Sequence, residues 1–201
     1  MKHASLLSVA ALSISLAVMG CRSDDGGSGN MPHHEATNKD EKPNRTTTAI
    51  ATIKPAQIAA TQPTKNIAGT VTFTQLGDKV TVVADITGLE ANSTHGIHIH
   101  EKPDLSAPDL MSTGGHYNPD HLTHGGAMAG MTHAGDLGNL TSDANGHARL
   151  EVVKSDISLG GMKNDVLGLP VIIHAGADDL KSQPAGNSGP RVAGGLIELR
   201  K

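Results

Sequence analysis

The chain has 201 residues, which suffices for one domain of ordinary size with an appendage. Its 16 basic and 20 acidic residues are spread along the chain without a basic block, so no nucleic-acid partner is predicted. With one Phe, one Tyr and no Trp, any core must be built from aliphatic side chains. The twelve histidines are the anomaly, and seven of them fall between His95 and His133.

Residues 1–20 have the pattern of a signal peptide. A short basic start precedes an apolar run from Ala4 to Val18, which is too short for a membrane span, so a cleaved export signal is predicted. The run ends in Val18-Met19-Gly20-Cys21, which resembles the lipobox of bacterial lipoproteins. The resemblance implies cleavage before Cys21, acylation of Cys21 and a lipid anchor to a bacterial membrane, on the periplasmic or extracellular side of the cell envelope. An ordinary signal with an unmodified thiol stays open.

Residues 21–48 comprise the lipidated Cys21 and a predicted disordered linker, because a polar stretch without apolar periodicity cannot bury a core. His33-His34 within it is either a weak metal-capturing pair or an incidental exposed pair. Cys21 is the only cysteine, so no intramolecular disulfide can form. The folded domain is predicted to be residues 49–201.

From Ala49 onward, short runs alternate between apolar and polar residues, which is typical of strands with one buried face. The clearest run is Val80 to Thr87, and the turn Gly77-Asp78 joins it to the run before it as a hairpin. Further strands are expected at 49–53, 94–100, 147–153, 168–174 and 192–200. About eight strands with no helical period predict an all-β fold, an antiparallel sandwich or barrel.

Two long irregular stretches, 101–137 and 175–190, interrupt this pattern. Structureless loops of that length are usually functional in compact domains. Disulfides are not available to order them, so another kind of cross-link is expected.

The histidines indicate what that cross-link is. On a strand, His98 and His100 project from one face, whereas His95 lies on the other face with the isoleucines and is expected to be a buried, hydrogen-bonded residue. Paired imidazoles suit copper or zinc. The following loop adds three imidazoles and a carboxylate, a set that satisfies a closed four-coordinate zinc site: His116, His124, His133 and Asp136. His174 ends an apolar strand where the second loop begins.

Six motifs in order resemble those of copper–zinc superoxide dismutases, over about three quarters of the chain. They are Thr94–Glu101, Gly115–Pro119, His124–Gly126, His133–Asn139, Val171–Leu180 and Gly189–Gly195. The resemblance implies an eight-stranded Greek-key barrel or sandwich of the immunoglobulin-like kind, with two long functional loops. It also implies an enzyme that converts superoxide anion to oxygen and hydrogen peroxide by redox cycling of copper beside a structural zinc.

Carried over onto this chain, the resemblance assigns ligands residue by residue. Copper takes His98, His100, His116 and His174, and zinc takes His116, His124, His133 and Asp136. His116 bridges the two metals as an imidazolate and carries a proton during catalysis. Asp178 matches the carboxylate that links His98 and His124.

Other residues of the resemblance guide the substrate or depart from the family pattern. Arg191 matches the arginine that attracts and orients the anion, and little more than its positive charge suggests a similar role for Lys181. The family's intradomain disulfide is absent, because Leu110 and Gly194 stand where its cysteines would be. His121 and His147 match no motif and are expected to be solvated.

Two other functions remain open at this point. The chain could be a catalytically weak copper-binding or copper-delivery protein of the same fold, although a carrier needs neither Arg191 nor a full zinc set. A histidine-rich zinc scavenger would explain the number of histidines but not their order. The sequence leaves open whether the chain forms a homodimer.

Overall fold

The computed structural model describes residues 45–58, 66–128, 130–161 and 163–200. The predicted signal peptide, the predicted lipidation site Cys21 and the pair His33-His34 lie outside the described residues. The first strand begins at Thr47, slightly before the boundary expected at Ala49.

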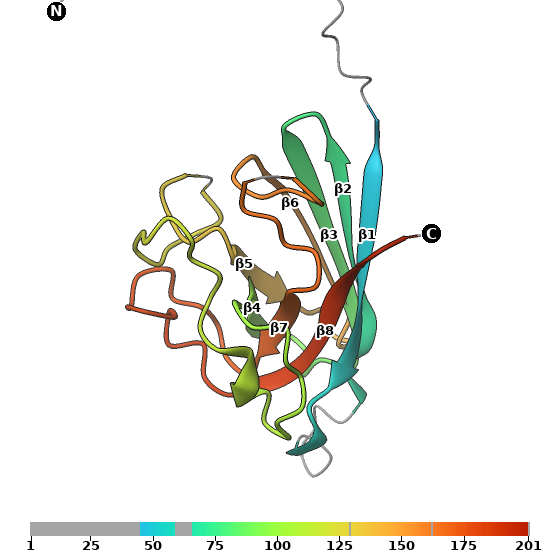
Figure 1. Ribbon diagram of the computed structural model, residues 1–201. Coiled ribbons are helices and arrows are strands. Elements are labelled where there is room, and N and C mark those ends of the chain that lie inside the picture. Colours follow the sequence, from blue (N-terminus) through green and yellow to red (C-terminus); the bar gives the residue numbers. More distant parts are fainter. Residues whose placement is uncertain (1–44, 59–65, 129, 162, 201) are drawn as a thin grey trace, which may run out of the picture. The chain divides into compact units, whose positions relative to one another are not determined.

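Eight antiparallel strands form one sheet that curves into a nearly closed barrel (Figure 1). They are β1 (Thr47–Pro55), β2 (Ala68–Leu76), β3 (Lys79–Thr87), β4 (Thr94–Ile99), β5 (Asp136–Thr141), β6 (Ala148–Lys154), β7 (Pro170–His174) and β8 (Arg191–Leu199). Their order in the sheet is β5-β4-β7-β8-β1-β2-β3-β6. Hairpin neighbours such as β1 and β2 are adjacent, whereas β3 and β4, and β6 and β7, are separated, as in a Greek key. The all-β prediction is confirmed. The described residues contain no α-helix, and so none that is long and apolar enough to cross a membrane.

The core is the inner face of this sheet, as the alternating sequence predicts. In β3 the inward residues Val80, Val82, Ala84 and Ile86 are all buried. Phe73, on the paired strand β2, is buried opposite Val82. Gly77 closes the predicted β2–β3 hairpin with a φ of 62°, a left-handed conformation that favours glycine.

A buried lysine lies where the barrel comes closest to closing. Strands β5 and β6 form the two ends of the sheet, and Lys154 is the last residue of β6. Its ammonium pairs with Asp156 (Nζ to Oδ2, 3.2 Å) and donates to the main-chain oxygen of Asp136 at the start of β5 (3.3 Å). Because a buried ammonium needs acceptors, these contacts hold the two sheet ends together.

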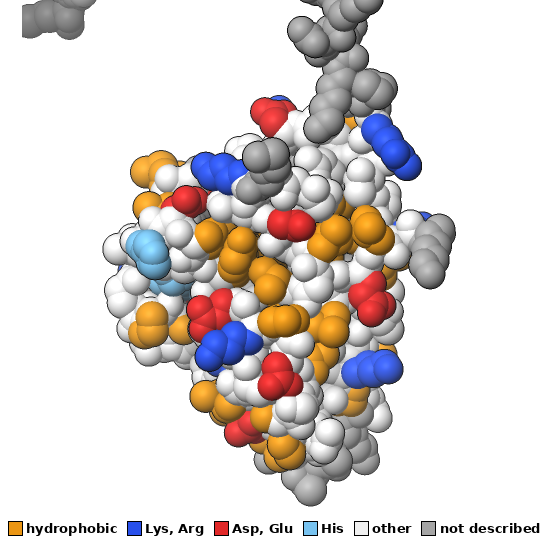
Figure 2. Space-filling model, in the orientation of Figure 1, with side chains coloured by type: hydrophobic (Ala, Val, Ile, Leu, Met, Phe, Trp, Pro, Cys, Tyr) orange, Lys and Arg blue, Asp and Glu red, His pale blue; other side chains and the backbone are white. Residues whose placement is uncertain are grey.

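The irregular segments differ from the prediction in one respect. The two expected loops are present, at 100–135 and 175–190, and Figure 1 shows them on the side of the barrel that carries β4, β5 and β7. A third irregular connection, 155–169, joins β6 to β7, and the sequence pattern does not predict it. Its residues Ile157, Leu159 and Val166 are buried in the main core, so it covers one part of the barrel. On the face in view in Figure 2, acidic and basic side chains are interspersed, with apolar side chains between them.

Candidate metal centre

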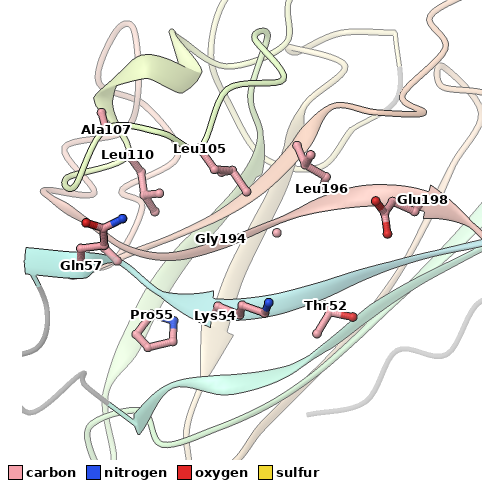
Figure 3. Close-up of a pocket in the computed structure, with 12 residues that line it drawn as sticks. Thr52, Lys54, Pro55, Gln57, Leu105, Ala107, Leu110, Gly194, Leu196 and Glu198 are labelled. Carbon is pink, nitrogen blue, oxygen red and sulfur yellow. The ribbon is translucent and has the colours of Figure 1, made fainter.

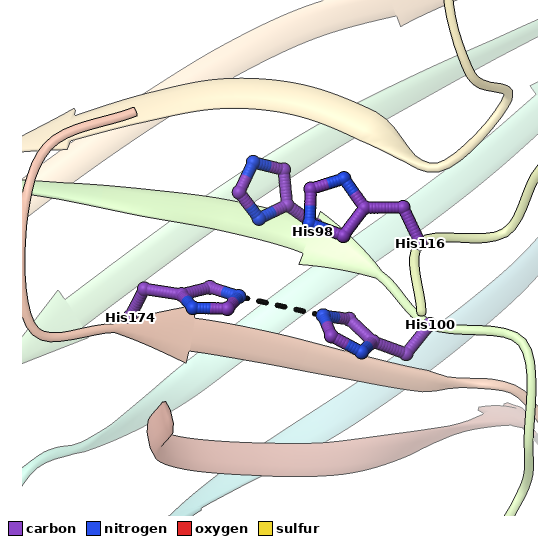
Figure 4. A group of neighbouring side chains, drawn as sticks. All are labelled: His98, His100, His116 and His174. Carbon is purple, nitrogen blue, oxygen red and sulfur yellow. Dashed lines mark hydrogen bonds between the residues drawn. The ribbon is translucent and has the colours of Figure 1, made fainter. Parts of the chain in front are cut away.

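Four histidines that are distant in sequence converge at the C-terminal end of β4. His98 and His100 come from β4 and the residue after it, His116 from the first loop and His174 from the end of β7. One ring nitrogen of each lies within 4.8 Å of the others, and all four residues are buried (Figure 4). Two strand ends and a loop therefore build a single cluster of imidazoles.

Outer hydrogen bonds fix which nitrogen of three rings faces the cluster. His98 Nε2 donates to Asp178 Oδ2 (2.8 Å), His100 Nδ1 to Gly114 O (3.0 Å) and His174 Nδ1 to Gly189 O (3.0 Å). The opposite nitrogen of each ring then carries a lone pair. His98 Nδ1 has no hydrogen-bond partner, and His100 Nε2 lies 3.4 Å from His174 Nε2 (Figure 4). Two inward lone pairs at that separation call for a cation between them.

Burial keeps these rings neutral. Desolvation, and then the neighbouring rings of His116 and His174, lower the pKa of His98 well below its usual value. The same two causes lower the pKa of His100, and desolvation lowers the pKa of His174 to about 4. At neutral pH these imidazoles therefore offer lone pairs, which is the form that binds a metal.

A second cluster surrounds one carboxylate at the start of β5. Asp136 Oδ2 accepts from the backbone N–H of Gly125 and of His133, at 3.1 Å each. Its other oxygen, Oδ1, faces three Nδ1 atoms: those of His116 (2.9 Å), His124 (3.1 Å) and His133 (3.4 Å). Although burial opposes it, hydrogen bonds from His116 and Gly125 lower the pKa of Asp136 and keep the carboxylate charged.

The two clusters share His116. Its Nδ1 belongs to the carboxylate cluster, and its Nε2 is buried without a hydrogen-bond partner. Its ring stacks on that of His98 with centroids 3.8 Å apart. The second cluster has the three-imidazole, one-carboxylate composition that zinc prefers, and the first has the all-imidazole composition that suits copper. The residues present therefore fit two neighbouring metals, and the sequence-predicted ligands are all brought together.

Asp178 links the two clusters by hydrogen bonds to one ring of each, as the sequence motifs predicted. Its Oδ1 accepts from His124 Nε2 (2.9 Å), while its Oδ2 accepts from His98, one ring of each cluster. Asn139 holds Asp178 through two reciprocal bonds, Nδ2 to the Asp178 carbonyl (2.9 Å) and Oδ1 from the Asp178 N–H (2.8 Å). The position of Asn139 within a family motif was the only sequence signal for this role.

The second loop also holds His124 directly, which the sequence did not reveal. The Gln183 side chain accepts from the backbone N–H of His124 (2.8 Å) and donates to its carbonyl (3.0 Å). Gly186, at φ 63°, lies so close that a Cβ there would overlap Asp178 Oδ1 and lie 2.6 Å from His124 Nε2. The contacts of Gln183 and Gly186 with His124 have no local sequence pattern, because they join two separate loops.

The three other histidines of the described residues behave as expected. His95 is buried, with Nδ1 donating to the main-chain oxygen of His174 (2.9 Å) and Nε2 lying 2.6 Å from the hydroxyl of Ser93. His121 is exposed. His147 is also exposed and pairs with Asp85 at the surface.

Comparison with known proteins decides the family. The family model described as copper/zinc superoxide dismutase matches residues 67–197. The chain belongs to the copper/zinc superoxide dismutase family. Among curated members it is 40% identical to the superoxide dismutase [Cu-Zn] of Schizosaccharomyces pombe over 150 residues, which cover 71% of this chain and 96% of the relative. It is 38% identical to that of Paramecium bursaria Chlorella virus 1 over 141 residues, covering 67% and 74%.

A solved structure shares the fold. The crystal structure of the clock protein EA4 superposes with a TM-score of 0.65 at 39% sequence identity, covering 76% of this chain and 94% of that one. Copper and zinc are the metals of the superoxide dismutase family, in agreement with the two ligand clusters.

A leucine takes the place of the absent superoxide dismutase disulfide. Leu110 is 6% exposed and packs with Ala56, Ile172 and Leu105. Its Cδ1 would lie 3.4 Å from a Cβ on Gly194, so apolar packing joins the two positions that the missing bond would link. A cavity of about 470 Å³ opens beside this contact, on the outer side of β1 and β8 (Figure 3), and none of the clustered metal ligands lines it.

Arg191 is fixed to the same segment of the first loop. Its Nη1 donates to Leu110 O (2.6 Å) and Thr113 Oγ1 (2.9 Å), and its Nη2 donates to Gly114 O (2.6 Å). Gly114 O also accepts from His100, so the guanidinium and a clustered ring share one acceptor. Three hydrogen bonds, two of them to main-chain carbonyls, thus tie Arg191 to the segment that carries Leu110.

Proposed function

We propose that this chain converts superoxide to oxygen and hydrogen peroxide at a bridged copper–zinc site. The observation that carries the proposal is the ring of His116, whose two nitrogens each belong to a different buried cluster. A single-metal protein has no need for that arrangement. Membership of the superoxide dismutase family supports it.

The donor atoms support one assignment of ligands. Copper would be held by His98 Nδ1 together with the inward nitrogens of the other first-cluster rings: His100, His116 and His174. Zinc would be held by Asp136 Oδ1 and three Nδ1 atoms: those of His116, His124 and His133. Asp178 orients one ring of each set, because it accepts their outer N–H groups.

Arg191 serves as the binding group for the anion. A guanidinium has five N–H donors, and among the described residues three hydrogen bonds to protein acceptors leave two free for a ligand. Arg191 and His174 line one cavity of about 260 Å³, so the cation and a copper-ligand ring face the same space. A fixed positive charge there attracts superoxide and orients it by hydrogen bonds.

When bound, copper supplies the one-electron oxidation and reduction of superoxide, and zinc supplies fixed geometry. His116 Nε2 is buried without a hydrogen-bond partner, so it is the atom that would hold the proton for the second superoxide whenever that nitrogen is not a copper ligand. The remaining rings hold position through their outer hydrogen bonds.

The test combines metal analysis with a dismutase assay on the purified protein. The proposal expects one copper and one zinc per chain and rapid removal of superoxide. Arg191→Ser is expected to keep both metals and lose most of the rate, whereas the control Arg149→Ser, which removes an exposed arginine paired with Glu151, keeps it. Copper binding without turnover would favour the delivery protein, and several loosely held zinc ions would favour the scavenger.

We also propose that the protein is lipid-anchored through Cys21 in a bacterial cell envelope, where it removes superoxide. The lipobox-like sequence Val18–Cys21 supports this. Metabolic labelling with a fatty acid is expected to mark the native chain and not Cys21→Ser, and the variant is expected to leave the membrane fraction. Measuring the molecular mass of the protein in solution tests whether it forms a homodimer, which would have twice the mass of one chain.

A further inference from the structure

Among the described residues, three methionines are more than half exposed, although methionine is usually buried. Met111 is 61% exposed, Met128 60% and Met131 68%. Of these three, Met111 alone lines the cavity that also contains His174 and Arg191. The three methionines are similarly exposed but differently placed, so Met128 and Met131 serve as internal controls for Met111.

The backbone holds Met111 in that position. It begins the short 3₁₀ turn η3 (Met111–Thr113), where its N–H donates to Asp109 Oδ1 (3.0 Å). The residue before it, Leu110, is buried and bound through its carbonyl by Arg191. The thioether is therefore carried on a braced segment at the rim of the cavity.

We propose that Met111 is a sacrificial oxidation site that consumes hydrogen peroxide at the mouth of the copper site. The inference rests on the proposed function, which makes peroxide the product. In the reaction the thioether sulfur attacks one peroxide oxygen, an S–O bond forms and the O–O bond breaks. The sulfur is oxidised to the sulfoxide, and the second oxygen leaves as water with both protons.

The position selects Met111 over the other two methionines. Peroxide that leaves the cluster, or returns to it, passes through the cavity that Met111 lines with His174. Copper held by His174 would polarise peroxide in that cavity and so speed the attack of the Met111 thioether, whereas Met128 and Met131 do not line it. Oxidation at Met111 would spare the imidazoles behind it, since a thioether is the softer and more readily oxidised group.

The experiment uses the full chain, loaded with copper and zinc or stripped of both, and adds hydrogen peroxide. Peptide mass spectrometry measures the sulfoxide fraction at the three methionines. In the loaded protein Met111 is expected to be oxidised several-fold faster than Met128 and Met131. In the metal-free protein the three are expected to oxidise at similar rates, in line with their exposure. Equal rates in the loaded protein would overturn the proposal.

Two variants test the protective role. Met111→Leu keeps the side-chain volume, and Met128→Leu is the matched control. Met111→Leu is expected to increase oxygen addition to histidine-containing peptides several-fold and to speed copper loss under peroxide, while the control matches the parent. No change in Met111→Leu would refute protection. If superoxide is not consumed at all, the proposed function fails, whereas the response to added peroxide still decides the role of Met111.

Discussion

Replacing Leu110 with Ala tests whether packing substitutes for the missing disulfide. Leu110 is 6% exposed and lies against Ala56, Ile172 and Leu105. Leu→Ala in such a site typically costs about 2–5 kcal/mol, from lost burial and the cavity that remains. For a domain of this size, 1 kcal/mol shifts the melting temperature by about 2–4 °C, so we expect a decrease of roughly 4–20 °C. Alanine has the same difficulty as leucine with the φ of 59° at this position, so the change isolates packing.

The assay is thermal unfolding of the metal-loaded protein, followed by circular dichroism. Leu76→Ala is the matched control, because Leu76 is 50% exposed in β2 and should shift the melting temperature little. We also expect slower turnover in Leu110→Ala, since its carbonyl binds Arg191 and its displacement would loosen the guanidinium. A melting temperature equal to that of the Leu76 control would refute the idea that this contact braces the loop.

Three further outcomes are expected. Selective zinc removal should lower the melting temperature by about 8–16 °C if zinc is present at a thousandfold excess over its Kd, which corresponds to about 4 kcal/mol; an unchanged melting curve after verified removal would contradict this. In the metal-free protein the pKa of His174 is lowered to about 4 by desolvation, so the folded state binds fewer protons and loses stability as the pH falls from 6.5 towards 4. That loss is roughly 2 kcal/mol at pH 5, measured by urea unfolding, and a constant urea midpoint between pH 7 and pH 5 would argue against it. Asn139→Ala should weaken zinc binding about 10-fold in chelator competition, because Asp178 loses both of its bonds to Asn139; parent-like affinity would show that Asp178 needs no such support.

Strand periodicity explains why so much of the fold was predictable. Alternation in β3 placed Val80 and Ile86 in the core, and the same period of two put His98 and His100 on one face. The same alternation would have predicted the buried Lys154, which lies on the inward face of β6 with Ala148. The sequence did not reveal that 155–169 covers the core, because its buried residues Ile157, Leu159 and Val166 form no alternating run long enough to predict a strand.

The site was predictable where motifs carry it and hidden where loops meet. The clustered ligands and Asp178 were expected from motifs that resemble those of the superoxide dismutase family, and the structure brings these residues together. Gln183 was missed because its amide contacts His124 across 59 residues of chain, and only the folded positions of two loops create that contact. The way Leu110 compensates for the absent disulfide was likewise invisible, since it depends on how close Gly194 approaches.

Anomalous X-ray diffraction at the copper and zinc absorption edges would test the central claim most directly. The account predicts two separate peaks on opposite sides of one imidazole, copper at Nε2 and zinc at Nδ1 of His116. A single peak, or two peaks that do not flank that ring, would contradict it.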